Sequence, residues 1–179
     1  MLLTEIATLD EVLEAHAAVL GNDGTAYRNH TYRVVNLCLA TLSSAGPEHL
    51  EKIAVAAAFH DLGIWTDRTF DYLQPSIRLA GAHLARTGRE DWMPEISEMI
   101  LEHHKISAWR GHPDWLVEPF RRADWTDVTW GVRRFGLPRD VLREIFSTWP
   151  SAGFHKRILQ LGLRRLRRHP LNPLPMMKL

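Results

Sequence analysis

Hydrophobic positions near the start of the chain recur at helical spacing. The apolar residues that would share one helical face in this segment are Leu9, Val12, Leu13 and Leu20. Such spacing predicts an amphipathic helix. Thr8 and Glu11 have the spacing of a capping box, in which a hydroxyl and a carboxylate three residues later bind free backbone N–H groups. We therefore expect Thr8 to cap the first helix.

Proline and glycine divide the rest of the chain into segments of helical length. Pro47 suits a first turn, because a proline there loses no helical hydrogen bond, and Gly88 suits a helix end. The predicted helices span residues 25–44, 47–60, 75–87, 94–105, 113–129, 138–148 and 154–169. Pro119 is expected to kink or split its helix. The tail, residues 170–179, holds three prolines and is expected to be extended.

The pattern favours one fold class. No long alternation of apolar and polar residues competes with the helical spacing, and no internal repeat or linker divides the chain. A length of 179 residues suits one domain with a substantial core. We therefore predict an all-α, single-domain helical bundle over residues 1–179.

Composition narrows the range of partners. Lys and Arg number 22 against 21 Asp and Glu, a net charge of +1, so overall charge gives no reason to expect nucleic acid. No apolar run approaches the length of a spanning helix, and the acidic N-terminus does not look like a secretory signal. Cys38 is the single cysteine and is expected to be a buried thiol. These features predict a cytoplasmic protein without membrane contact.

Basic residues nevertheless gather near the C-terminus. The arginines concerned are Arg164, Arg165, Arg167 and Arg168. Such a run is most often a solvated helix face. An interaction role, including packing of this helix in a homodimer, stays open as the alternative.

The histidines carry the chemistry of this sequence. The candidates are His30, the pair His60-Asp61, His83, the pair His103-His104, and Asp124. Imidazole and carboxylate are common ligands for divalent metals. Neighbours on a helix point about 100° apart, so His60 and Asp61 can both reach one ion near a helix end. An aspartate within the apolar run AVAAAFHDLGIW is costly unless its charge is compensated.

Each other candidate has a plainer interpretation as well. His30 could be a polar surface residue, and His83 a core histidine with its hydrogen bonds satisfied. His103 and Asp124 continue apolar helical faces, which places both inside. Taken together, these residues bring metal-type ligands from separate helices. The remaining histidines are expected to be structural or exposed: His16, His49, His112, His155 and His169.

In this order the residues resemble the signature of the HD superfamily of metal-dependent phosphohydrolases. The matching positions are His30 in YRNHTYRVV, His60-Asp61 in AAAFHDLGIW and Asp124 in RRADWTDV. The resemblance covers about residues 22–130, which would form the HD-like core, followed by C-terminal helices over 138–169. It implies an all-α core in which these four residues hold a divalent ion.

The resemblance extends to members that bind two metals. His83 and His103 stand where such members carry two further histidines, with His104 as an alternative or an addition to His103. Asp61 would then bridge two ions. The chain reads HHKISAWRGHP and has Ala26 where the HD-GYP cyclic-dinucleotide phosphodiesterases differ, which argues against that activity.

The implied reaction is hydrolysis of a phosphate ester by metal-activated water. Lys105 would contact the phosphate, or would simply be a cation that complements a helix C-terminus. The ions, one or two, would be Mn, Fe, Co, Ni, Zn or Mg. The expected partner is a small phosphate-containing molecule, nucleotides included. The alternatives are a mixed-valent di-iron oxygenase and a non-catalytic module that binds metal or nucleotide.

Overall fold

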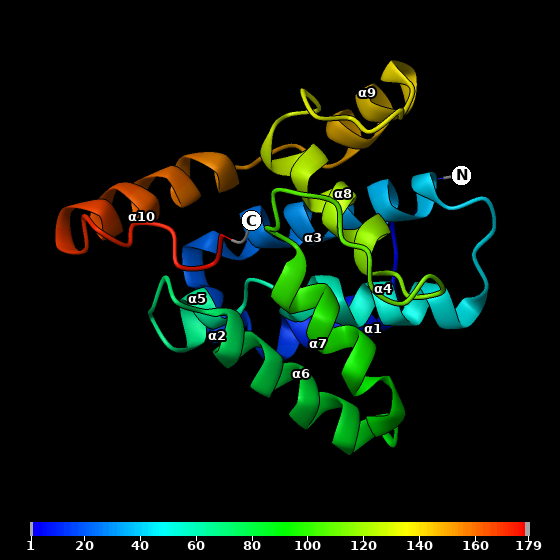
Figure 1. Cartoon of the computed structure of the whole chain (residues 1–179), viewed down its shortest axis with the longest axis horizontal. Helices are drawn as coiled ribbons and strands as arrows, with labels where there is room; N and C mark the ends of the chain where they lie inside the picture. The colour runs from blue at the N-terminus through cyan, green and yellow to red at the C-terminus, as the bar shows by residue number, and fades with distance from the viewer. Residues whose placement is uncertain (1, 178–179) are drawn as a thin grey trace.

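The computed structural model describes residues 2–177, which form helices joined by loops (Figure 1). The longer helices are α1 (Ala7–Ala15), α3 (Gly24–Thr41), α4 (Pro47–Phe59), α6 (Leu73–Thr87), α7 (Met93–Glu102), α8 (Val117–Val128), α9 (Arg139–Thr148) and α10 (Phe154–Arg168). The short ones are α2 (Ala17–Leu20) and α5 (Gly63–Thr66), with 3-10 turns η1 (Gly21–Asp23) and η2 (Glu90–Trp92). No β-strand occurs among these residues, which confirms the all-α prediction.

Proline and glycine place the helix ends much as the sequence predicts. Pro47 is the first residue of α4. Helix α6 ends at Gly88, whose φ of +67° lies in the left-handed region that favours glycine. Pro138 immediately precedes α9. These residues act through their own backbone, so the chain encodes such ends locally.

The start of α1 differs from the prediction. The helix begins at Ala7, after Ile6 as the N-terminal flanking residue, and no side chain caps it. The Thr8 hydroxyl instead donates a 2.7 Å hydrogen bond to Glu51 Oε2 on α4. A tertiary contact has therefore taken the hydroxyl that the capping box would need.

Two further segments also differ from expectation. Helix α8 begins at Val117, so Pro119 falls in its first turn, where proline removes no helical hydrogen bond, and the helix does not split. Residues 170–177 contain turns and are not a continuous extended strand. The buried side chain of Met176 ties this segment to the rest of the molecule, while residues 178–179 of the predicted tail lie outside the described part.

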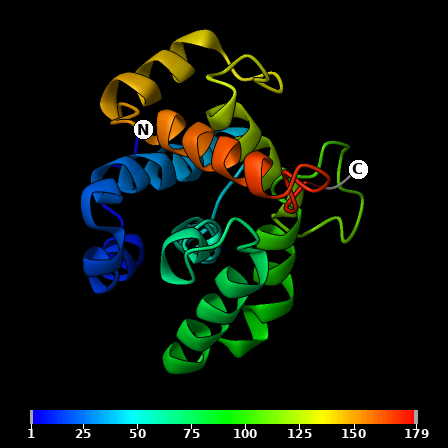
Figure 2. The same ribbon diagram turned by 90° about the vertical axis from the view of Figure 1, so that its left-hand side faces the viewer.

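Helix α3 is the centre of the packing. It contacts α4, α8, α9 and α10, and α7 packs against both α6 and α8. Figures 1 and 2 show α6 and α7 side by side below this group and α10 crossing above α3. The ends of α4 and α7 thus come close to the middle of α3 and to α8. The buried His and Asp side chains of the candidate site lie where these four helices meet.

Gly63 allows α6 to approach the chain directly after the His-Asp pair. A Cβ atom at residue 63 would lie 2.6 Å from the Tyr72 carbonyl oxygen and 2.9 Å from Pro75 Cβ. The Gly63 N–H donates a 3.0 Å hydrogen bond to Ser76 Oγ. Only glycine fits this close approach.

No helix among residues 2–177 is long and apolar enough to cross a membrane.

Candidate metal centre

Four segments bring the candidate ligands together. His30 lies in the middle of α3 and Asp124 in α8. His60 and Asp61 directly follow α4, and the pair His103-His104 directly follows α7. These residues form three overlapping groups whose ligand atoms lie within 4.8 Å of one another. The groups are His30, His60 and Asp124; His60, Asp61 and His103; and His103, His104 and Asp124.

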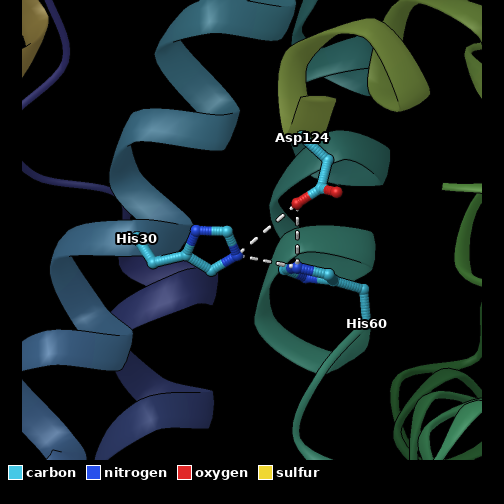
Figure 3. A group of neighbouring side chains, drawn as sticks. All are labelled: His30, His60 and Asp124. Carbon is cyan, nitrogen blue, oxygen red and sulfur yellow. Dashed lines mark hydrogen bonds and ion pairs between the residues drawn. The ribbon is translucent and has the colours of Figure 1, made fainter. Parts of the chain in front are cut away.

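The distances at His30 and His60 suit one metal ion. His30 Nε2 lies 2.9 Å from His60 Nε2 and 3.7 Å from Asp124 Oδ1 (Figure 3). Asp61 Oδ2 lies 3.8 and 3.6 Å from the same two nitrogens. Two ligands bound to one ion at about 2.1 Å lie ~3.0 Å apart at right angles and ~3.4 Å apart at the tetrahedral angle. His30, His60 and Asp124 therefore form one candidate set of ligands for a small cation. Asp61 joins His60 and His103 in a second, overlapping set.

The other oxygens of both carboxylates face the His103-His104 pair. Asp61 Oδ1 lies 3.5 Å from His103 Nε2. Asp124 Oδ2 lies 3.4 Å from His104 Nδ1. Each aspartate thus presents one oxygen to His30 and His60 and the other to His103 or His104. The structure places both members of the adjacent histidine pair in the cluster, where the sequence leaves the choice open.

The outer nitrogen of each ring is tied to the protein. His60 Nδ1 donates to the Ala57 carbonyl at 2.8 Å, and His103 Nδ1 to the Ile100 carbonyl at 2.6 Å. His30 Nδ1 donates to Asp127 Oδ2 at 2.6 Å. A neutral imidazole has one N–H, so these bonds leave a lone pair on the nitrogen that faces the cluster. Metal-binding histidines are typically oriented in this way.

The contact between His30 and His60 calls for a cation. Both Nδ1 atoms face acceptors, so both Nε2 atoms carry lone pairs in the neutral rings, and these atoms are 2.9 Å apart. Two lone pairs at this distance repel each other unless a metal ion or an additional proton lies between them. The neighbouring carboxylate oxygens increase the negative potential. The arrangement can therefore hold a positively charged species.

Most carboxylate oxygens of the cluster also lack a hydrogen-bond donor in the part of the chain that the structure describes. Asp61 Oδ1 and both carboxylate oxygens of Asp124 are buried and accept no hydrogen bond within the described residues. Burial raises the pKa of Asp124 to about 7. Buried carboxylates are costly unless a cation compensates their charge. A divalent cation could compensate the charge of both aspartates, whereas one proton would satisfy only one oxygen.

The histidines differ in their readiness to bind a metal. Burial lowers the pKa of His60 to about 3, and the nearby His103 and His30 add to this effect against the attraction of Asp61. His60 is therefore neutral, as a ligand must be. Burial also opposes the charged form of His103, but the nearby carboxylates of Asp61 and Asp124 raise its pKa above the usual value. A proton therefore competes with a metal at His103.

Asp127 is a site residue that the sequence argument missed. Besides accepting from His30, its carboxylate accepts from Arg33 Nε and Nη2, and all three side chains are fully shielded from solvent. Arg33 also donates to the Trp149 carbonyl at 2.9 Å. The pair orients His30 from behind. The sequence spacing could have revealed Asp127, because it lies three residues after Asp124 and therefore shares the same face of the helix.

Tyr72 is a second residue that the sequence did not indicate. Its hydroxyl lies 2.8 Å from His104 Nε2, and the side chain is almost fully buried. Burial and the nearby Asp61 raise the pKa of Tyr72 well above its usual value, so the hydroxyl keeps its proton. His104 is the most exposed of the clustered side chains at 16%, against 5% or less for its partners Asp61 and Asp124. The His104 side is therefore the most open side of the cluster.

The structure does not bring His83 to the other candidates. Among the described residues, none of the three groups includes it. Its Nδ1 accepts a 3.0 Å hydrogen bond from Arg86 Nη2, and its ring lies against Phe59 with centroids 5.4 Å apart. His83 is buried in α6 away from the cluster, where packing on Phe59 and the nearby Arg86 satisfy it. This placement matches the plainer of its two interpretations.

Lys105 lies beside the cluster but outside the three groups. Its Nζ is 3.9 Å from Glu102 Oε2, and its carbonyl accepts from Arg121 Nη1 and Trp125 Nε1, each at 3.0 Å. Its backbone thereby ties the end of α7 to α8. The groups also leave out the five histidines expected to be structural or exposed, which are His16, His49, His112, His155 and His169.

The described part of the chain therefore combines a helical fold with a buried His/Asp cluster that could bind a metal, an arrangement compatible with an HD-like fold. Comparison with protein families, with curated proteins and with solved structures finds no match for this chain.

Proposed function

We propose that this protein is a metal-dependent phosphohydrolase of the HD type. One observation carries the proposal: the unprotonated nitrogens of His30 and His60 face each other at 2.9 Å, beside two buried carboxylates. The order of these ligands along the chain resembles the HD signature. The open side at His104 gives a small phosphate ester a direction of approach.

The donor set is compatible with hydrolysis. Divalent ions bound by such residues acidify a water molecule and neutralise charge on phosphoryl oxygens. Asp61 and Asp124 each offer two oxygens, which suits the bridging of two ions. The protonated Tyr72 hydroxyl, beside His104, would donate a hydrogen bond to a phosphoryl oxygen. Lys105, the next residue after His104, would add a positive charge for the phosphate.

Metal content and phosphate release test the proposal together. The purified protein would be analysed for bound metals and then screened with phosphomonoesters and nucleotides in the presence of Mn, Fe, Co, Ni, Zn or Mg. We expect stoichiometric metal and metal-dependent release of phosphate. Loss of a hydrogen bond to a metal ligand typically lowers metal affinity or activity by roughly 10- to 100-fold. Asp61→Asn changes a proposed ligand itself, so it should reduce metal content and phosphate release by more than this.

His112→Ala is the matched control. His112 stacks on Trp115 with ring centroids 5.3 Å apart and belongs to none of the metal groups, so the variant should keep both metal and activity. Protein that binds none of these metals would contradict the proposal. Iron-dependent consumption of dioxygen without phosphate release would favour the oxygenase instead, and metal binding without turnover would favour a non-catalytic module.

A further inference from the structure

A second polar site lies outside the metal centre. A cavity of about 700 Å³ is bounded by α10, by α5 and the loop that follows it, and by α2 with η1. Figures 1 and 2 show α10, in orange to red, reaching over α2 and α5. Six basic side chains line the cavity: Arg68, Arg157, Arg164, Arg165, Arg168 and His169. None of the clustered metal-type residues does.

The charge of this cavity is largely uncompensated. Asp23 is its single acidic lining residue, and it is already bound to Arg157 Nε at 2.8 Å and to Trp65 Nε1 at 2.9 Å. Within residues 2–177, Arg164 and Arg168 form no ion pair. Helix α10 itself, FHKRILQLGLRRLRR, contains no acidic residue. Because the whole chain has a net charge of only +1, this excess of positive charge is local.

The arginines are directed to one place by the helix and the loop. Arg157, Arg164 and Arg168 are separated by seven and four residues, so they share one face of α10. Arg68 faces them from the loop, with a φ of +52° in a region that residues other than glycine rarely adopt. Strained backbone of this kind is concentrated at binding sites. Ordinary solvation of a helix face would require neither the facing arginine nor its conformation.

We infer that this cavity binds a compact, multiply charged phosphate ligand of the oligophosphate class. Guanidinium groups bind phosphate oxygens through paired, charge-assisted hydrogen bonds. A cavity of about 700 Å³ has the size of a small-molecule site. Walls of one charge sign concentrate the field on an anion that enters. This inference does not depend on the proposed hydrolase activity.

The cavity and the metal centre share structural elements. Helix α5 begins two residues after Asp61. Trp65, in the cavity wall, lies 4.8 Å from the Tyr27 ring, which in turn stacks at 6.4 Å from His60. Phe154, the first residue of α10, stacks on His30 at 3.9 Å. A ligand that holds α10 against α5 would therefore act on elements that contact the metal centre.

Calorimetric titration with inorganic tripolyphosphate tests the inference. The test variant is Arg164→Gln with Arg168→Gln. The matched control is Lys156→Gln with Arg167→Gln, which removes the same charge from exposed positions of α10 outside the cavity. Loss of one charged hydrogen-bond partner costs about tenfold in affinity, so the test pair should weaken binding about a hundredfold. The control should change it only a few-fold.

Two outcomes would overturn the inference. One is an absence of binding to the native protein, and the other is an equal loss in both variants, which would indicate general attraction to a basic helix. Asp124→Asn distinguishes this site from the metal centre, because binding in the cavity should survive that change. Titration with ATP and with vesicles containing phosphatidylinositol bisphosphate then distinguishes a free oligophosphate from a lipid headgroup. Saturation by tripolyphosphate and ATP without vesicle binding identifies the free form.

Discussion

The candidate metal centre and the arginine-lined cavity concentrate opposite charges by different means. The carboxylates of the metal centre are buried, and hydrogen bonds to the protein fix the outer sides of their histidine neighbours. The arginines of the cavity lie at the surface, and most of them lack an acidic partner among the described residues. Within residues 2–177, neither region has enough side chains of opposite charge to balance it. Only at the candidate metal centre do hydrogen bonds fix the side chains around the position that a compensating ion would occupy.

This difference indicates how each region should respond to solution conditions. Buried groups interact at low effective dielectric and are screened little by salt. Their occupancy should depend on protons, which compete with a metal for the same atoms. Exposed arginines keep their charge near neutral pH but are screened strongly by salt, so binding in the cavity should weaken as the ionic strength rises.

Breaking the Arg33–Asp127 pair should have the largest effect on stability. Both side chains are fully shielded from solvent. Arg33→Met leaves the Asp127 carboxylate buried without its guanidinium, which should lower the free energy of unfolding by about 3–5 kcal/mol. Urea denaturation followed by circular dichroism would measure the change.

A surface pair provides the comparison. Arg78 Nη2 lies 2.7 Å from Asp67 Oδ1, with 64% of the Arg78 side chain exposed. Arg78→Met should change the unfolding free energy by less than about 1 kcal/mol. Equal effects of the two substitutions would mean that the region behind His30 is not the rigid support described here.

Metal affinity should rise with pH across neutrality. The pKa of Asp124 is raised to about 7 and that of His103 lies above its usual value. Below these values both groups hold a proton that a metal must displace, so affinity falls as the pH falls. Two displaced protons correspond to roughly a hundredfold weaker binding for each pH unit well below both pKa values. Competition with a metal indicator between about pH 5.5 and 8 would measure it.

The same titration separates the two regions. His60 should add nothing to this slope, because its pKa of about 3 leaves it neutral throughout. Tripolyphosphate binding in the cavity should instead depend strongly on salt, because the arginines keep their charge throughout this range. A metal affinity that stays constant with pH would contradict the proton competition at His103 and Asp124.

Gly63→Ala should disturb the turn that carries the His-Asp pair. The new methyl group would meet the Tyr72 carbonyl oxygen at 2.6 Å, so α6 must shift, at a cost of about 1–3 kcal/mol. Gly24→Ala is the control, since its Cβ would meet only Leu20 Cβ at an ordinary 3.8 Å. It should be neutral or stabilise α3 by up to about 1 kcal/mol. Thermal unfolding of both variants would check the contrast.

The sequence predicts the fold well where local chemistry determines structure. Pro47, Pro138 and Gly88 mark helix ends through their own backbone preferences, and the structure confirms those ends. The capping role of Thr8 was wrong because Glu51, 43 residues away, binds its hydroxyl. Competition from a distant partner leaves no trace in local spacing.

At the candidate site, too, the sequence could not predict what depends on packing between distant segments. Helical spacing placed His103 and Asp124 inside, the resemblance to the HD signature added His30, and the structure brings the three into the cluster. His83 has equally apolar neighbours in the sequence, but the rotation of α6 directs it to Arg86 and Phe59. That rotation depends on packing between helices. The arginine run likewise gave no indication that Arg68 would face it from another loop.

The smallest expected effect concerns the open side of the metal centre. Tyr72→Phe removes the hydroxyl beside His104 Nε2 and keeps the ring. One hydrogen bond contributes about 0.5–1.5 kcal/mol, so metal affinity should fall by up to about tenfold, with stability nearly unchanged. Tyr27→Phe is the comparison, because it removes a hydroxyl that donates to the Ala58 carbonyl and interacts with the Asp61 backbone but leaves the hydrogen bond at His104 in place. If Tyr27→Phe weakened metal binding as much as Tyr72→Phe, the loss would come from a general disturbance of the packing around α4. The hydrogen bond between Tyr72 and His104 would then make no specific contribution to metal affinity.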